Sequence, residues 1–340
     1  MRSSPRPILS RCIPLLLLGA CSVFGGLSPE ERDQLQFYRQ NAGVYFRGDR
    51  YEQALDMARK GLELDPEDYH LLVTAALCNL QRAGDDVQGS GSDAQMLQTA
   101  EGFFDRAFAL RDFEDNAPEA ILGYATTKQR LGRDLRRRAN VLASELERAE
   151  LAENDRIRRE SQRREFEVRA LSYWSEARRA LKVLLERQEL LRFAHKQLME
   201  ISAELNEYEP AVEHGNACLA ENRRAQDRAN QVIRETMDPG EEIRMRGELQ
   251  GLLDQEKRVR SALAEMHFRK QEFAAAVEQL DALLALDPTR SADYYNRGRA
   301  LERLDRRDAA RRDYEKFLYT TSLPASDERV AHATRSTQRN

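Results

Sequence analysis

The sequence is poor in the residues that interrupt helices and in those that build sheets. It has only 10 Pro and 17 Gly in 340 residues, aromatic residues make up 7%, and runs of β-branched residues are few. Strands need β-branched and aromatic residues, so a sheet protein is excluded. The composition is instead rich in Ala, Leu, Glu, Arg and Gln, which favour helices with broad solvated faces. We therefore predict an all-α protein.

A strong excess of charge of one sign is also missing. The net charge is −4, with 54 basic and 58 acidic residues mixed along the chain. Loss of residues 1–20 would remove three arginines and bring the net charge to −7. Nucleic-acid binding needs a basic surface, so we do not expect nucleic acid as a partner.

No hydrophobic run is long enough to span a bilayer, which takes about 20 apolar residues. The one apolar stretch, residues 12–18, follows three arginines and ends at Leu18, after which come Gly19, Ala20 and Cys21. This order is typical of a signal segment that is removed. The four residues Leu18, Gly19, Ala20 and Cys21 resemble the lipobox of bacterial lipoproteins.

That resemblance implies a lipid on the thiol of Cys21 and cleavage after Ala20. Residues 1–20 would be the signal peptide and residues 21–27 a lipidated tether, which would hold the protein at a membrane through covalent acyl chains, palmitate among them. The residue that follows Cys21, Ser22, resembles the pattern of outer-membrane lipoproteins, so we expect the periplasmic face of the outer membrane. An ordinary secretory signal that happens to contain Cys is the alternative.

Two further cysteines, Cys78 and Cys218, fall at small-residue positions of expected helices. A buried free Cys behaves as a small apolar group. A disulfide between them is the alternative in an oxidising compartment, and the spacing alone does not decide between the two.

The chain repeats itself with a period of about 34 residues. Residues 291–324 place aromatic, small, small, aromatic and apolar residues at Tyr294, Gly298, Ala310, Tyr314 and Phe317. Two other segments have the same spacing and end in Leu-Asp-Pro, at residues 64–66 and 286–288. These segments resemble tetratricopeptide repeats. The resemblance implies a right-handed helical solenoid that binds proteins.

Between these segments the repeat pattern is interrupted. We predict repeats over 28–117 with a flexible loop at 84–93, and a helix pair over 118–190 that extends as an antiparallel hairpin with its tip near 153–158. Residues 191–258 are predicted to form a second hairpin that turns near 237–240. Residues 259–324 are predicted to be C-terminal repeats and residues 325–340 a disordered tail.

The sequence offers no constellation for catalysis. Its five His residues form no metal-binding motif, and no nucleophile motif or dinucleotide fingerprint is present. His214 and Cys218 have helical i, i+4 spacing, but a metal site needs further ligands. We expect no enzyme activity, no cofactor and no metal.

With catalysis not expected, the function to consider is the binding of another molecule. First helices line the inner face of a tetratricopeptide solenoid, and the predicted first helices carry arginines whose forked guanidinium groups suit carboxylates. They are Arg39, Arg47, Arg258, Arg269, Arg299 and Arg303. We expect these residues to form a groove for an acidic segment or a free C-terminus, with ordinary solvated arginines as the alternative. Asn296 matches one position of the carboxylate clamp of chaperone-binding family members, but the other clamp residues are missing.

The sequence therefore predicts a non-catalytic, membrane-anchored scaffold or adaptor that binds protein partners in the bacterial cell envelope and helps assemble an envelope complex. Two alternatives remain open: a chaperone-like adaptor that regulates peptidoglycan enzymes, and a structural spacer that self-associates through its coiled-coil hairpins.

Overall fold

The computed structural model describes residues 27–84, 91–148 and 152–338. The signal segment, the lipobox and Cys21 lie outside the described residues. Over these ranges the chain is helical and contains no strand, so the predicted all-α class is confirmed. The helices are α1 (Pro29–Arg47), α2 (Tyr51–Leu64), α3 (Tyr69–Arg82), α4 (Gly91–Phe108), the short 3₁₀ turn η1 (Phe113–Asp115), α5 (Pro118–Arg148), α6 (Glu153–Glu186), α7 (Leu191–Glu204), α8 (Tyr208–Glu235), α9 (Pro239–Arg269), α10 (Phe273–Leu286), α11 (Ser291–Arg303), α12 (Arg307–Thr320) and α13 (Glu328–Gln338).

Helix ends follow from local sequence signals. At the start of α1, the Ser28 hydroxyl accepts a hydrogen bond from the Glu31 backbone at 3.2 Å, and the Glu31 carboxylate accepts one from the Ser28 backbone at 2.8 Å. This capping box satisfies two backbone donors that the first turn leaves unpaired. At the starts of α3 and α9, the side chains of Asp68 and Asp238 each accept one backbone hydrogen bond, from Leu71 and Gly240.

The helices pair into repeats through a recurring turn. Two residues after α1, α7, α9 and α11 end, the chain adopts a left-handed conformation, with φ between 56° and 62° at Asp49, Asn206, Gln271 and Asp305. The next backbone N–H then bonds a carbonyl five residues earlier, at 2.8 to 2.9 Å. Such a turn closes the helix C-terminus and starts the next helix. The helix pairs α1/α2, α7/α8, α9/α10 and α11/α12 are therefore equivalent units.

Small residues occupy the same place in each unit. Five residues after the left-handed position lies a fully buried alanine, at Ala54, Ala211, Ala276 and Ala310. In the last unit, a Cβ atom added to Gly298 would lie 2.7 Å from a ring carbon of Tyr314. The two helices of a unit can approach closely because these positions carry almost no side chain.

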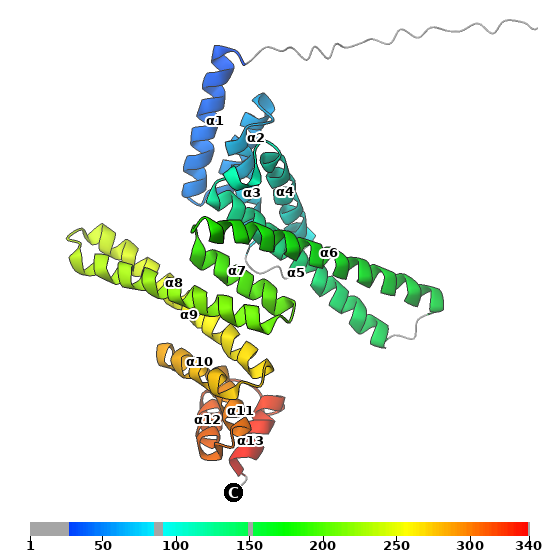
Figure 1. Ribbon diagram of the computed structural model, residues 1–340, viewed down its shortest axis with the longest axis vertical. Helices are drawn as coiled ribbons and strands as arrows, with labels where there is room; N and C mark the ends of the chain where they lie inside the picture. Colours follow the sequence, from blue (N-terminus) through cyan, green and yellow to red (C-terminus); the bar gives the residue numbers. More distant parts are fainter. Residues whose placement is uncertain (1–26, 85–90, 149–151, 339–340) are drawn as a thin grey trace, which may run out of the picture.

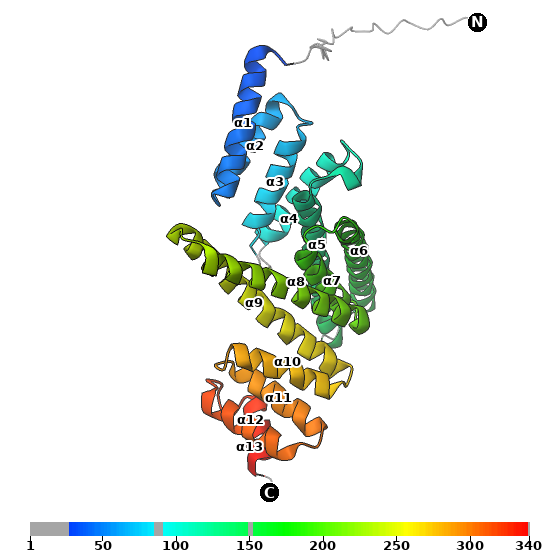
Figure 2. The same cartoon turned by 60° about the vertical axis from the view of Figure 1, so that its left-hand side comes forward.

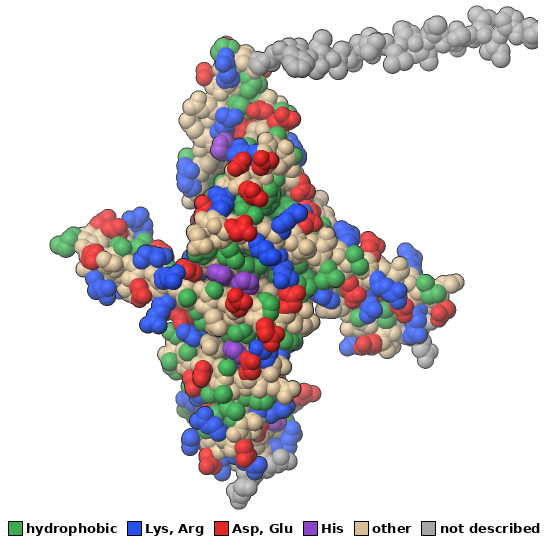
Figure 3. Space-filling view, viewed as in Figure 1, with side chains coloured by type: hydrophobic (Ala, Val, Ile, Leu, Met, Phe, Trp, Pro, Cys, Tyr) green, Lys and Arg blue, Asp and Glu red, His purple; other side chains and the backbone are tan. Residues whose placement is uncertain are grey.

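Two hairpins project from the solenoid, as predicted, and they point in opposite directions (Figure 1 and Figure 3). The first arm consists of the far parts of α5 and α6, which are 31 and 34 residues long, whereas α2, α7, α10 and α12 have 14. It joins the two helices of one repeat. The second arm consists of the ends of α8 and α9 that meet at residues 236–238, and it joins one repeat to the next (Figure 2). The arms diverge because these two kinds of connection lie at opposite edges of a solenoid.

Several predicted boundaries are wrong. The predicted tip of the first arm, 153–158, lies within α6, and the described helices end and begin at Arg148 and Glu153. Residues 91–93 of the predicted loop begin α4, and the boundary at 258 falls inside the continuous helix α9. The tip of a hairpin and the solvated face of a helix are both rich in polar residues, so the sequence alone does not show where the helix ends.

The predicted disordered tail is also wrong, because residues 328–338 form α13. Ala333 is fully buried, and Val330 packs with it against the core of the last repeat. The His332 ring lies 5.8 and 5.5 Å from the rings of Tyr295 and Tyr314. This helix covers apolar surface that the last repeat would otherwise leave in water.

Candidate partner-binding site

Two adjoining hollows lie along the first helices of successive repeats. One, of about 360 Å³, is lined by residues of α5, α7 and α9, by the turn after α7 and by the first residue of α8. The other, of about 340 Å³, is lined by residues of α9, α10 and α11. Glu265 and Arg269 line both hollows. We call the combined surface the inner groove.

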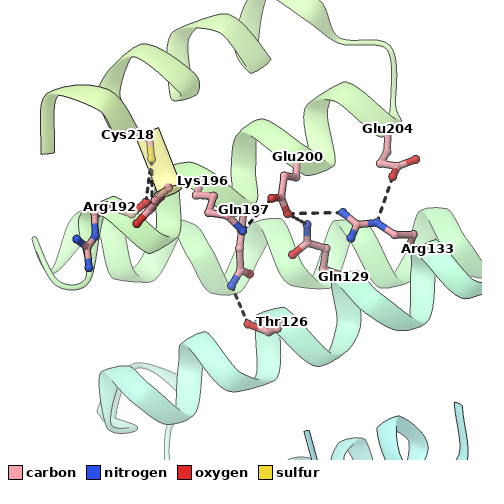
Figure 4. A network of polar contacts seen from close by, with 10 residues as sticks. Thr126, Gln129, Arg133, Arg192, Lys196, Gln197, Glu200, Glu204 and Cys218 are labelled. Atoms are coloured by element: carbon pink, nitrogen blue, oxygen red, sulfur yellow. Dashed lines mark hydrogen bonds and ion pairs between the residues drawn. The ribbon is translucent and has the colours of Figure 1, made fainter. Parts of the chain in front are cut away.

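The part of the inner groove at α5 and α7 is a network of internal polar pairs (Figure 4). The Arg133 guanidinium lies 3.2 Å from the Glu204 carboxylate and 3.5 Å from that of Glu200. Glu200 also accepts a hydrogen bond from Gln129 at 2.8 Å and pairs with Lys196 at 2.9 Å. Burial alone would raise the pKa of Glu200, but Lys196 and Arg133 outweigh it and lower that pKa. These charges neutralise one another, so this part of the groove has little charge left for a partner.

The part of the inner groove at α9 and α11 has an apolar floor, formed by Ala264, Phe268 and Leu280. The Arg299 guanidinium carbon stands 5.1 Å from the centre of the Phe268 ring. One helical turn along α11, Arg303 stands 5.5 Å from the Phe273 ring. Stacking on an aromatic ring holds a guanidinium in place and leaves its edge N–H groups exposed.

Neither Arg299 nor Arg303 has a carboxylate partner within 4.0 Å among the described residues. Arg269, on the same rim, is paired with Glu265 at 2.7 Å. Asn296, an exposed amide, also lines this hollow. The arrangement offers two positioned cations and an amide beside an apolar floor, which suits a carboxylate next to an apolar side chain.

The six arginines predicted for the groove do not all lie together. Arg269 and Arg299 line it, and Arg303 follows on the same helix. Arg39 lies on α1 and is ion-paired with Asp68. The two exposed residues Arg47 and Arg258 line neither hollow. Of the three helices that carry the predicted arginines, α9 and α11 line the hollows and α1 does not, and the sequence could not show which arginines already have an acidic partner.

Two polar clusters were not predicted. On α7 and α8, the Nδ1 atoms of His195 and His214 are 3.1 Å apart, and burial lowers the pKa of both rings. On α5, the buried Lys128 ammonium lies 2.7 Å from Glu101 and 2.8 Å from Glu176, which belong to α4 and α6. The partners are far apart in sequence, so no local spacing could have revealed either cluster.

Candidate chemistry elsewhere is limited. Cys78 and Cys218 are buried free thiols, so the disulfide left open by the sequence is not formed. Burial raises their pKa values to about 12 and about 11. Across the part of the chain that the structure describes, no three His, Cys, Asp or Glu side chains are placed to hold a metal ion. Over the same ranges, every helix is too short or too polar to cross a bilayer.

Comparison with known proteins supports the repeat assignment at the C-terminal end. Residues 294–320 match the family model of the tetratricopeptide repeat. The matched segment covers most of α11 and α12. Among curated proteins, none matches the chain significantly in sequence.

Several solved structures of tetratricopeptide proteins are similar to this chain. Pseudomonas aeruginosa PilF has 13% identity, covers 90% of this chain and 99% of its own, and gives a TM-score of 0.45. A repeat-containing protein of Cytophaga hutchinsonii has 12% identity, 88% and 93% coverage and a TM-score of 0.49. PilW, a type IV pilus biogenesis factor, has 13% identity, 91% and 100% coverage and a TM-score of 0.44. Similarities of this size do not transfer a function or a location to this chain.

Proposed function

We propose that this chain is a non-catalytic scaffold that binds a protein partner in its inner groove while a lipid on Cys21 holds it at the bacterial cell envelope. The observation that carries the binding role is the arginine pair of α11. Both guanidinium groups are stacked on aromatic rings of the adjacent α9/α10 unit and neither is neutralised by a carboxylate of the described residues. The proposed ligand is an acidic segment or a free C-terminus with an apolar residue beside its carboxylate.

The floor of the groove supports a ligand of mixed character. Phe268 and Leu280 provide apolar contact within the hollow of about 340 Å³. A carboxylate bound by Arg299 would lie directly beside this floor, with the Asn296 amide as a further hydrogen-bond donor. Because most binding free energy comes from a few buried anchors, these residues suffice to define a subsite.

The anchor rests on the sequence. Leu18, Gly19 and Ala20 precede Cys21 in the order of a lipobox, and α1 begins eight residues after that cysteine. A tether this short would keep the repeats close to the bilayer. The periplasmic face of the outer membrane and a role in assembling an envelope complex are part of this proposal.

The groove is tested by the double substitution Arg299→Glu/Arg303→Glu. Partners would be recovered by affinity purification from detergent extracts. The identity of the recovered protein distinguishes three cases: an assembly protein, a peptidoglycan hydrolase, or a second copy of this chain. We expect the partner to be lost, because reversing two charges turns attraction for a carboxylate into repulsion. The matched control is Arg307→Glu/Arg311→Glu on α12, since both of these arginines are exposed outside the groove. Equal recovery with both variants contradicts the proposal.

The anchor is tested by Cys21→Ala. We expect this variant to leave the membrane fraction or to keep its signal segment, because the thiol that would carry the lipid is gone. Lipidation would be contradicted if Cys21→Ala fractionates with the membrane as the wild type does and if the mass of the wild-type protein shows no added acyl chains.

A further inference from the structure

A second groove runs along one side of the first arm, away from the inner groove. It consists of two hollows, of about 500 and 550 Å³, which share Arg137 and Val141. The apolar side chains in it are Val141, Leu142 and Phe166. Val141 is 53% exposed, because an arm of only two helices has little other apolar surface against which to bury it. We call this surface the arm groove.

Part of the lining has the spacing of a coiled-coil seam. Among the nine residues of α5 that line the arm groove, steps of three and four residues alternate along the series Asp134, Arg137, Val141, Ser144 and Arg148. On α6 the same steps separate Arg159, Gln162 and Phe166. An average step of 3.5 residues keeps a seam straight along a partner helix. Two helices therefore present matched seams to the same hollow, over about 21 Å of α5.

The charge of the arm groove selects the partner. Four arginines line it, at 137, 138, 148 and 159, against two carboxylates, Asp134 and Glu145. Arg137 and Arg138 both pair with Asp134, at 2.7 and 2.8 Å, and Arg159 pairs with Glu145 at 2.5 Å. With four guanidinium groups against two carboxylates, the lining keeps a net positive charge on both sides of its apolar centre.

From this geometry we propose that the arm groove binds an acidic amphipathic helix of a protein partner, which packs as a third helix on α5 and α6. The apolar face of that helix would contact Val141, Leu142 and Phe166, and its flanking carboxylates would face the arginines. This site does not depend on the inner groove, because no residue lines both surfaces.

Two other occupants fit the arm groove less well. An anionic membrane prefers a protruding basic face, whereas this surface is recessed and contains two carboxylates. A second copy of the arm would bring two sets of four arginines together, which like-charge repulsion opposes. An acidic helix has neither disadvantage.

The test uses the purified full-length chain and a fluorescent synthetic peptide of about three heptads, with Leu at the seam positions and Glu on both sides of them. Fluorescence anisotropy measures binding at physiological salt. We expect Val141→Glu and Arg138→Glu/Arg148→Glu each to weaken binding by about tenfold or more, and added salt to weaken binding by the wild-type chain. A peptide with Lys in place of Glu should not bind.

Matched controls lie on the same arm outside the groove. Val168 is an exposed valine of α6, and Arg164 and Arg169 are exposed arginines of that helix. Val168→Glu and Arg164→Glu/Arg169→Glu should bind the peptide as the wild type does, and circular dichroism should show that all variants are equally helical. Absence of binding, or equal binding by all variants, overturns the proposal.

The alternative occupants give distinct results. Cosedimentation with phosphatidylglycerol vesicles that is lost in Arg138→Glu/Arg148→Glu, without peptide binding, would assign the surface to a membrane and overturn the proposal. A dimer in sedimentation velocity that Val141→Glu dissociates would assign it to a second copy and also overturn it. If the peptide does not bind the arm groove, the loss of the inner-groove partner expected for Arg299→Glu/Arg303→Glu is unaffected. The two proposals can therefore be refuted independently.

Discussion

The joint at which the first arm leaves the solenoid provides a sharp test of the packing. Trp174, the single tryptophan of the chain, is fully buried there and donates a hydrogen bond from Nε1 to the Gln129 carbonyl at 3.2 Å. Gly132 lies against its ring. A Cβ atom at residue 132 would be 2.5 Å from Nε1 and 2.7 Å from Cδ1. The substitution Gly132→Ala must therefore displace the indole.

The size of the effect follows from three contributions. Alanine gains about 1 kcal/mol of helix propensity over glycine. Overpacking a buried ring costs about 1–3 kcal/mol, and loss of the indole hydrogen bond costs about 1 kcal/mol more. Gly132→Ala should thus lower the free energy of unfolding by about 1–3 kcal/mol. The matched control Gly102→Ala, on an exposed face with no atom within 4 Å, should raise it by about 0.5–1 kcal/mol.

Urea denaturation followed by circular dichroism measures both changes. Tryptophan fluorescence reports the joint directly, because the only emitting indole is the one displaced. We expect a red-shifted native emission for Gly132→Ala and an unchanged emission for Gly102→Ala. If Gly132→Ala is as stable as Gly102→Ala and its emission is unchanged, α5 and α6 do not approach each other as described.

Three further predictions concern buried polar groups. Burial depresses the pKa of His195 and His214 below 6.5, so as pH falls below 6.5 the unfolded chain takes up protons that the folded chain does not, and the folded state loses stability; the melting temperature should drop between pH 7.5 and 5, and His195→Gln should flatten that profile. Since burial raises the pKa of Cys78 to about 12 and of Cys218 to about 11, neither thiol should react with a disulfide reagent at pH 8 until denaturant is added; rapid labelling of the native chain would contradict their burial. Lys128→Met should destabilise the chain by about 2–3 kcal/mol in urea denaturation, less than for a fully buried pair because Glu101 and Glu176 are partly exposed; a neutral effect would contradict the ion pairs.

Much of the fold could be predicted because its signals are local. A small residue, a turn and a helix-ending proline recur within one 34-residue period, and each determines the backbone around it. The long helices of the arms were visible for the same reason, since apolar residues continue at three- and four-residue steps. The tail was missed because α13 is weakly patterned by itself and becomes helical against Tyr295 and Tyr314.

The candidate site was harder to predict because it depends on contacts between repeats. Arg39 and Arg299 have the same residue type on equivalent helices, yet Asp68 pairs with the first and Phe268 stacks on the second. Both partners come from another helix, so the sequence of α1 or α11 alone does not show which arginine keeps its charge available. The arm groove was missed because α5 and α6 each contribute only part of it.

Site-specific photocrosslinking in cells tests the central claim, that the inner groove binds a protein partner, most directly. A photoreactive residue at position 296 lies in the groove, and one at the exposed position 315 on α12 serves as the control. We predict a protein adduct at 296 that is absent at 315 and disappears when Arg299→Glu/Arg303→Glu is added. Adducts of equal yield at both positions, or an adduct at 296 that survives the charge reversal, would contradict it.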